Sequence, residues 1–201
     1  MNACSLINDS QRPMLHWRVA FGFGALLTLY YLCFSSEYMS PWIRMYYLIS
    51  YQEYGFISRV FMGSVLRFLV HATPTQPEVY AFVSMICLLE IALVSYWLGK
   101  VTSLASRQHR LGVLYFSLLF CASPFCVRNH FHSNMFGRMD MALLICYILV
   151  CGIMVLHQKR HFFGTLLICT IAMLNHHAFV FLYLPSLLGL QLYTKRSVKH
   201  V

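Results

Sequence analysis

Long apolar blocks separated by short polar segments dominate the chain. A membrane-spanning helix needs about 20 apolar residues to cross a hydrocarbon core of about 30 Å. The blocks cover approximately residues 19–36, 79–99, 111–127, 141–157 and 162–193. The last block is interrupted near its middle by Asn175-His176-His177, so we split it into two short helices. The pattern predicts an all-α fold, a polytopic transmembrane bundle of about six embedded helices.

The mixed segment 37–78 contains one further predicted helix, over residues 55–70. Arg59, Gly63 and Arg67 recur there every four residues, which would place them on one stripe of an amphipathic surface helix. As a seventh span, the same segment would bury two arginines in hydrocarbon, at about 2.5–3.5 kcal/mol each. We therefore expect it to lie at the outer membrane surface.

Composition agrees with a membrane protein. Hydrophobic residues make up 59% of the chain and charged residues only 10%, whereas soluble domains carry about 25% charged residues. None of the eight cysteines forms a CxxC pair, so we interpret them as packing residues and not as a disulfide or metal framework. We expect residues 1–201 to form a single membrane domain, either a whole protein or the N-terminal part of a larger one.

The distribution of Lys and Arg predicts the orientation. With six passes and a cytoplasmic N-terminus, ten of the 15 Lys and Arg residues fall inside and five outside. Both termini would then be cytoplasmic, in the inner (plasma) membrane. The positive inner face suits anionic membrane lipids as partners and does not indicate nucleic acid.

In this topology three polar clusters share the outer face: residues 51–59, 128–140 and 175–177. Carboxylates could act there as a general base, and Arg and His could bind phosphate. The candidate catalytic residues are Glu53, Asp140 and Glu37, and the candidate substrate-binding residues are Arg59, Arg138, Arg128, His176 and His177. If these clusters form one site, Glu53 or Arg59 should lie within about 12 Å of Arg138, Asp140 or His176, the span of a small ligand pocket.

Each candidate also has a structural interpretation. Asp140 could cap the fourth helix, and Arg138 could pair with it or reach lipid headgroups. A Glu53–Arg59 pair could hold the surface helix, and the two histidines could close a helical turn. Adjacent histidines rarely face one ion and HExxH is absent, so no metal or other cofactor is expected.

Glu90 is a carboxylate near the centre of the second predicted span. A charge at that depth is costly, so such a residue is by default a functional candidate. It could line a transport pathway, or it could make an interhelical hydrogen bond.

Four short motifs carry a resemblance to known proteins: YGFISRVFMGSVL, SPF, GRMD and NHHAFVFLYLP. Over about residues 40–187 they resemble a group of poorly characterised bacterial polytopic membrane proteins. More distantly, that group is similar to polysaccharide polymerases and GT-C-type glycosyltransferases. Where a His-Glu pair would be expected at the hairpin tip, this chain has His176-His177.

The resemblance implies envelope polysaccharide or glycolipid assembly, with sugar transferred from a polyprenyl-phosphate-linked donor on the outer face. It also implies a catalytic acid in the first outer loop, where Glu37 and Glu53 lie. Two alternatives stay open. The chain could be a transporter or channel subunit with Glu90 in its pathway, or a non-catalytic membrane scaffold.

Overall fold

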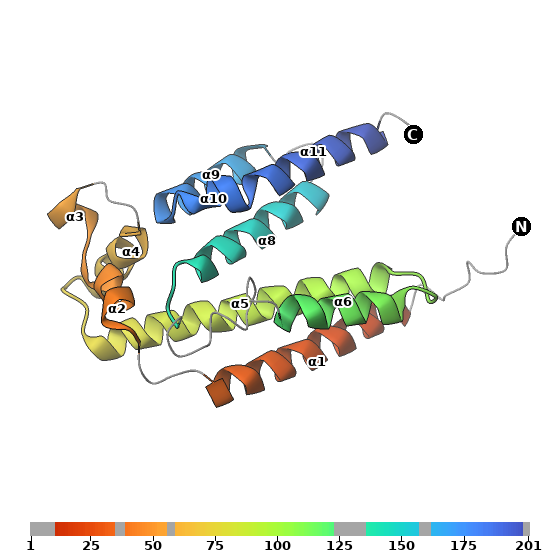
Figure 1. The fold of residues 1–201 in the computed structure, drawn as a ribbon, viewed down its shortest axis with the longest axis horizontal. Coiled ribbons are helices and arrows are strands. Elements are labelled where there is room, and N and C mark those ends of the chain that lie inside the picture. The colour runs from red at the N-terminus through yellow and green to blue at the C-terminus, as the bar shows by residue number, and fades with distance from the viewer. Residues whose placement is uncertain (1–10, 35–38, 56–58, 123–135, 157–161, 199–201) are drawn as a thin grey trace, which may run out of the picture. The chain divides into compact units, whose positions relative to one another are not determined.

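A computed structural model describes residues 11–34, 39–55, 59–122, 136–156 and 162–198 (Figure 1). Every regular element within these ranges is an α-helix, which confirms the predicted all-α class for this part of the chain. The helices are α1 (Gln11–Phe34), α2 (Pro41–Leu48), α3 (Tyr51–Tyr54), α4 (Phe61–Val70), α5 (Gln76–Leu104), α6 (Arg110–Ala122), α8 (Asp140–Leu156), α9 (Phe162–Asn175), α10 (Ala178–Leu182) and α11 (Leu184–Val198).

Within the described ranges, α5 alone is both long enough and apolar enough to cross a membrane, judged by length and composition. The other apolar blocks form helices where the sequence pattern predicts them, in α1, α6, α8 and α9. Several of these helices are shorter than a full span of about 20 residues. The number of membrane passes therefore stays a prediction.

The chain divides into two compact units. One comprises Met1–Met39 and Cys87–Phe136, and the other Ser40–Ile86 and Gly137–Val201. The long helix α5 contributes to both. The expectation that residues 1–201 act as a single membrane domain stays a prediction, and each unit is described by itself below.

The first unit contains α1, α6 and the C-terminal part of α5. Here α5 approaches α1 closely at Gly99. A Cβ atom at this position would lie 2.6 Å from the backbone oxygen of His16 and 2.9 Å from the Cβ of Ala20. The His16 ring also packs edge-on against Tyr96, with ring centroids 4.9 Å apart. The missing side chain of Gly99 therefore permits this helix contact.

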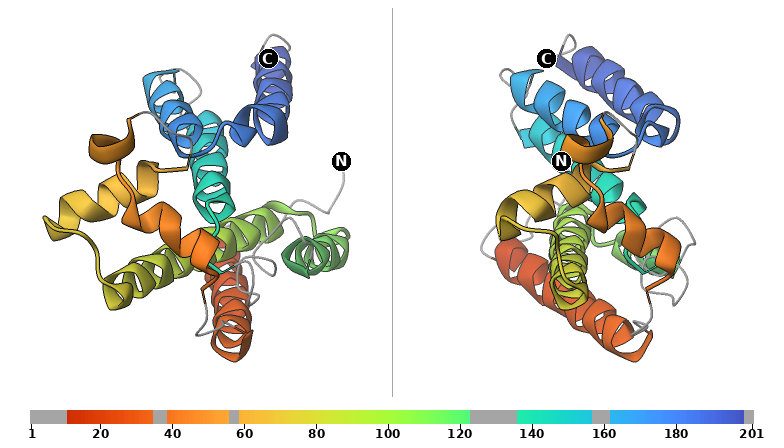
Figure 2. Two further views of the ribbon diagram at one scale, coloured as in Figure 1. Left: turned by 60° about the vertical axis from the view of Figure 1, so that its left-hand side comes forward. Right: turned by 90° about the vertical axis from the view of Figure 1, so that its left-hand side faces the viewer.

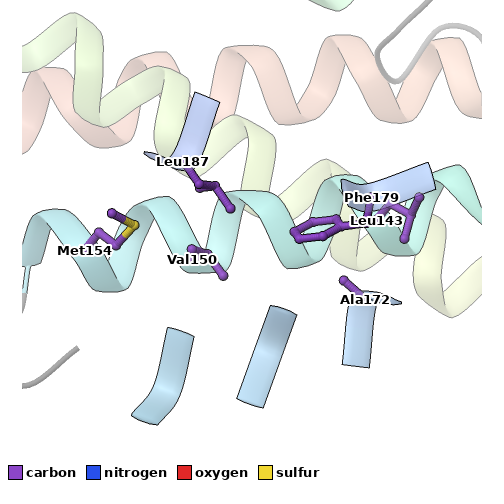
Figure 3. Packing of buried hydrophobic residues seen from close by; sticks show 6 residues of the cluster. All are labelled: Leu143, Val150, Met154, Ala172, Phe179 and Leu187. Carbon is purple, nitrogen blue, oxygen red and sulfur yellow. The ribbon is translucent and has the colours of Figure 1, made fainter. Parts of the chain in front are cut away.

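The core of the second unit is built around α8, which packs against both α9 and α11 (Figure 2). Figure 3 shows six buried side chains that fill the space between these helices and α10. They are Leu143, Val150, Met154, Ala172, Phe179 and Leu187. The rings of Tyr147 and Tyr183 extend the same contact, with centroids 4.9 Å apart.

The interruption of the last apolar block is confirmed. Helix α9 ends at Asn175 and α10 begins at Ala178. A second break, at Tyr183, separates α10 from α11, so the block forms three helices where two were predicted. Pro185 lies in the first turn of α11, a position where its missing N–H leaves no helical bond unmade.

Helices α2, α3 and α4 precede α5 in this unit, and α4 packs against α2, α3 and α9. The predicted helix over residues 55–70 is wrong at its start. Helix α4 begins at Phe61, and Arg59 lies before it with a φ of 74°, outside any helix. Only Gly63 and Arg67 of the predicted stripe are helical. Gly63 is buried where a Cβ would collide with the backbone oxygens of Ile49 and Tyr46.

This close approach makes Gly63 a test of the packing of α4. We expect Gly63→Ala to lower the free energy of unfolding by about 1–3 kcal/mol, because the backbone of α2 must move. Gly189→Ala in α11 is the matched control, since its Cβ would meet nothing within 4 Å. That change should raise stability by about 0.5–1 kcal/mol. Thermal unfolding followed by circular dichroism in detergent would measure both, and an unchanged or higher melting temperature for Gly63→Ala would contradict the packing.

Candidate functional site

A cavity of about 340 Å³ opens in the second unit. It brings together residues from α2, from the segment before α4, from the start of α8 and from the turn after α9. Its lining consists of Trp42, Ile43, Tyr46, Arg59, Gly137, Arg138, Met139, Asp140 and His176. All three polar clusters predicted from the sequence thus contribute to one cavity. The expected proximity is confirmed for Arg59 and His176, whose side-chain nitrogens lie 2.8 Å apart.

The backbone of Arg59 is strained. A φ of 74° places this non-glycine residue in the left-handed region, at a cost of about 1–2 kcal/mol. Its backbone N–H donates to the backbone oxygen of Asn175 over 3.0 Å, and this bond holds the conformation in place. Strain of this kind is concentrated at functional sites, where the surrounding structure maintains it.

The guanidinium of Arg59 is fixed on two sides. Its Nε–H donates to Nε2 of His176 at 2.8 Å, and one Nη1–H donates to the hydroxyl of Tyr46 at 3.3 Å. The guanidinium carbon lies 5.6 Å from the centroid of the Tyr46 ring, within the range of a cation–π contact. Arg59 therefore presents its charge to the cavity in a defined position.

His176 is buried, and its other ring nitrogen also faces a donor. The backbone N–H of Ala178 points at Nδ1 over 3.0 Å. Burial, followed by the positive charge of Arg59, lowers the pKa of His176 from its ordinary value, and the neighbouring His177 and Arg138 act in the same direction. The carboxylate of Asp140 opposes this shift without reversing it. The ring is therefore neutral at neutral pH.

Arg138 and Asp140, which also line the cavity, form an ion pair in which Nε of Arg138 lies 3.1 Å from Oδ2 of Asp140. Both side chains are partly exposed, so the pair itself contributes little stability. Asp140 is the first residue of α8, where a negative charge is favourable near the helix N-terminus. Two arginines, one aspartate and a neutral histidine give the cavity a net charge of one positive.

Two hydrogen bonds position the loop that carries Arg138. The Tyr47 hydroxyl donates to the backbone oxygen of Gly137 over 2.6 Å, and the Asn175 side-chain amide donates to the backbone oxygen of Met139 over 3.2 Å. Gly137 has a φ of 85°, which a residue with a side chain adopts only under strain. The sequence around Tyr47 carries no sign of this role, because the contact joins residues 90 positions apart.

Glu53 lies outside the lining of this cavity. Its carboxylate pairs with Arg67, and not with Arg59 as the sequence suggested. Arg67 also donates to the Ser50 hydroxyl over 3.3 Å. These contacts lie beside a second cavity of about 290 Å³, lined by Ser50, Tyr51, Gln52, Ser64, Arg67, Phe68 and His71. Of the predicted catalytic residues that the structure describes, Asp140 is therefore the one that lines the cavity with Arg59 and His176.

The remaining candidates are placed as follows. His177 is exposed, and its ring centroid lies 4.8 Å from that of His176. Glu90 is completely buried in α5, in the first unit. Glu37 and Arg128 lie outside the described residues. In the described ranges, no group of three or more His, Cys, Asp or Glu side chains could hold a metal ion.

The cavity has the groups needed to bind an anion beside a proton acceptor. Guanidinium groups bind phosphate or carboxylate oxygens, and a nearby carboxylate can take a proton from a hydroxyl. Comparison of the chain with protein-family models, with curated proteins and with solved structures found no match. The chemistry of the cavity is therefore argued from its own geometry.

The strain at Arg59 can be tested with a pair of variants. In the left-handed region glycine is favoured over alanine, so Arg59→Gly should be more stable than Arg59→Ala by about 1 kcal/mol. Both variants lose the same side-chain contacts. At Arg44, inside α2, the order should reverse, with Arg44→Ala more stable than Arg44→Gly by about 0.5–1 kcal/mol. Denaturant unfolding of the four variants would decide. Alanine being the more stable at both positions would show that Arg59 is not strained.

Proposed function

We propose that this chain is a multi-pass protein of the inner (plasma) membrane that acts in envelope polysaccharide or glycolipid assembly. In this proposal it transfers a sugar from a polyprenyl-phosphate-linked donor in the cavity lined by Arg59, Arg138, Asp140 and His176. One observation carries the proposal: two arginines, one of them held in a strained backbone conformation, share a cavity with a carboxylate. The motif resemblance to GT-C-type glycosyltransferases points in the same direction.

A lipid environment is supported by the helix surfaces. Phe21 of α1 is 79% exposed, Phe116 of α6 is 72% exposed and Phe163 of α9 is 81% exposed. Large apolar side chains exposed in such numbers are unfavourable in water and favourable against lipid tails. Together with α5 and the low charge content, they support several membrane passes.

The proposed reaction uses each charged group of the cavity. A polyprenyl-linked donor is anchored in the membrane, so its phosphate would lie at the level of the outer loops. The acceptor hydroxyl oxygen forms a bond to the anomeric carbon of the sugar as the bond from that carbon to the phosphate oxygen breaks. Asp140 takes the hydroxyl proton, and Arg59 and Arg138 neutralise the departing phosphate. Glu53 and Glu37, implied by the resemblance, remain secondary candidates for the base.

The position of Arg59 beside the cavity suits this role. Its backbone N–H is bound to the Asn175 oxygen, so the guanidinium is held within reach of the phosphate before the donor binds. Hydrogen-bond donors that are in place before the reaction stabilise developing charge with little reorganisation. Lysine would keep the charge but lose the planar guanidinium geometry.

The transferase proposal is tested by a conservative series in proteoliposomes. Asp140→Asn should lower the rate of labelled-sugar transfer from a polyprenyl-phosphate donor by about 10²–10⁴-fold. Arg59→Lys and Arg138→Lys should each lower it by about 10²–10³-fold. Arg44→Lys, an arginine outside the cavity lining, should leave the rate unchanged at matched protein levels. Wild-type rates in all three cavity variants would refute transfer at this site.

A transporter is the alternative favoured by one observation, the complete burial of Glu90 inside α5. A buried carboxylate in an apolar helix can carry protons or bind cations along a pathway. The transferase proposal expects Glu90→Gln to retain sugar transfer within about twofold, because Glu90 would have no part in the bond-making step. Loss of solute flux in Glu90→Gln, with Asp140→Asn unaffected, would favour the transporter.

The proposed topology places the two ends of α5 on opposite sides of the membrane. In a variant freed of native cysteines, Thr75→Cys should react with a membrane-impermeant maleimide in intact cells. Ala105→Cys should react only after permeabilisation, as should Val198→Cys near the C-terminus. These positions follow from the excess of Lys and Arg assigned to the inside. Labelling of position 198 from outside would contradict the six-pass arrangement.

A further inference from the structure

The two ring nitrogens of His176 both face N–H donors. Arg59 directs its Nε–H at Nε2 over 2.8 Å, and Ala178 directs its backbone N–H at Nδ1 over 3.0 Å. A neutral imidazole has one N–H group and one acceptor nitrogen, so it cannot accept both bonds. The protonated ring has no acceptor nitrogen and would oppose both donors. In either neutral tautomer, one of the two contacts sets one N–H against another.

The two possible neutral forms of His176 differ in which contact they satisfy. With the proton on Nδ1, the ring accepts from Arg59 and opposes the fixed backbone N–H of Ala178. With the proton on Nε2, the ring accepts from Ala178 and opposes Arg59. The backbone N–H cannot turn away without changing the turn between α9 and α10, whereas the Arg59 side chain can move. The second form therefore needs only an acceptor between His176 and Arg59.

We propose that an anionic phosphate oxygen binds between Nε2 of His176 and Nε of Arg59, with His176 as the Nε2–H tautomer. This inference rests on the proposed function and names the atoms that recognise its donor. The phosphate oxygen accepts from both nitrogens, while Nδ1 continues to accept from Ala178. The guanidinium must withdraw by about 2 Å, since two hydrogen bonds of about 2.8 Å replace one direct contact. Both ring nitrogens of His176 then have a compatible partner.

The charges around His176 favour a neutral ring before the anion binds. Arg59 faces it from the segment before α4, Arg138 and Asp140 from the start of α8, and His177 from the same turn. Burial and the positive groups lower the pKa of His176, and a bound phosphate opposes that shift. In the free protein the 2.8 Å contact with Arg59 requires an unprotonated Nε2, so the ring proton moves from Nδ1 to Nε2 when the phosphate binds. Arg138 supplies a second positive charge to the same cavity.

The test is the tautomer of His176 in the wild-type protein. The chain, labelled with ¹⁵N-histidine, would be placed in lipid nanodiscs containing polyprenyl phosphate, and the His176 signals assigned with His176→Asn. We expect the Nε2 signal to move to the protonated range and the Nδ1 signal to the unprotonated range. Parallel samples would contain inorganic phosphate or the uncharged polyprenol. A shift with polyprenyl phosphate alone identifies the lipid as the source, and a shift with inorganic phosphate identifies a free phosphate. A shift with neither, or an equal shift with polyprenol, overturns the proposal.

Binding of the same lipid phosphate provides a second readout. His176→Phe, which has no ring N–H, should weaken binding by about 10–100-fold, the range for a hydrogen bond to a charged group. His177→Phe is the matched control, because this exposed neighbour lies in the same turn and does not line the cavity. Equal affinities in His176→Phe and the wild type overturn the proposal. If the tautomer shifts but no sugar is transferred, phosphate binding at His176 is supported and the transferase function is refuted. If sugar is transferred but the tautomer does not shift, the transferase function is supported and this inference is refuted.

Discussion

The cavity of the second unit depends on the double attachment of Arg59 to the end of α9 and to the turn that follows it. The backbone N–H of Arg59 binds the Asn175 oxygen, and its side chain binds His176. Asn175 in turn donates to the oxygen of Met139 at the start of α8. One short polar network therefore joins the segment before α4, the helical hairpin and the loop that carries Arg138. The strained backbone of Arg59 persists because these bonds, together with the packing of α4, hold it in place.

Much of the helical framework could be predicted because it depends on local pattern. Apolar blocks form helices in both water and lipid, so α5, α8 and α9 lie where the blocks indicate. The polar sequence Asn175-His176-His177 marks the break between α9 and α10. The second break, at Tyr183, lies within an apolar run and has no such marker. The number of membrane passes does not follow from the pattern, since a buried core helix and a short span can have the same composition.

The prediction that Arg59 lies in a helix is wrong for a physical reason. Arg59, Gly63 and Arg67 are spaced four residues apart, as on one side of an amphipathic helix. Helix α4 does contain Gly63 and Arg67. The N–H of Arg59, however, is taken by a backbone oxygen more than a hundred residues away. The ion-pair partner of Glu53 could not be predicted either. The sequence contains several arginines, and only the folded structure shows that Glu53 pairs with Arg67. The convergence of Arg59, Arg138, Asp140 and His176 was expected from the predicted six-pass topology, which would place their segments on one face. Their shared cavity agrees with that expectation, and the topology itself stays a prediction.

The residues that line the cavity lie far apart in the sequence, and this separation affects when the cavity can form during translation. The contact between Arg59 and His176 joins residues 117 positions apart. A ribosome adding about 5–20 residues per second would need about 6–23 s to synthesise the intervening chain. During that interval Arg59 lacks the groups that hold its left-handed conformation. The geometry of the cavity is consequently among the last features of this unit to form during translation, because it needs the end of α9 and the turn that follows it.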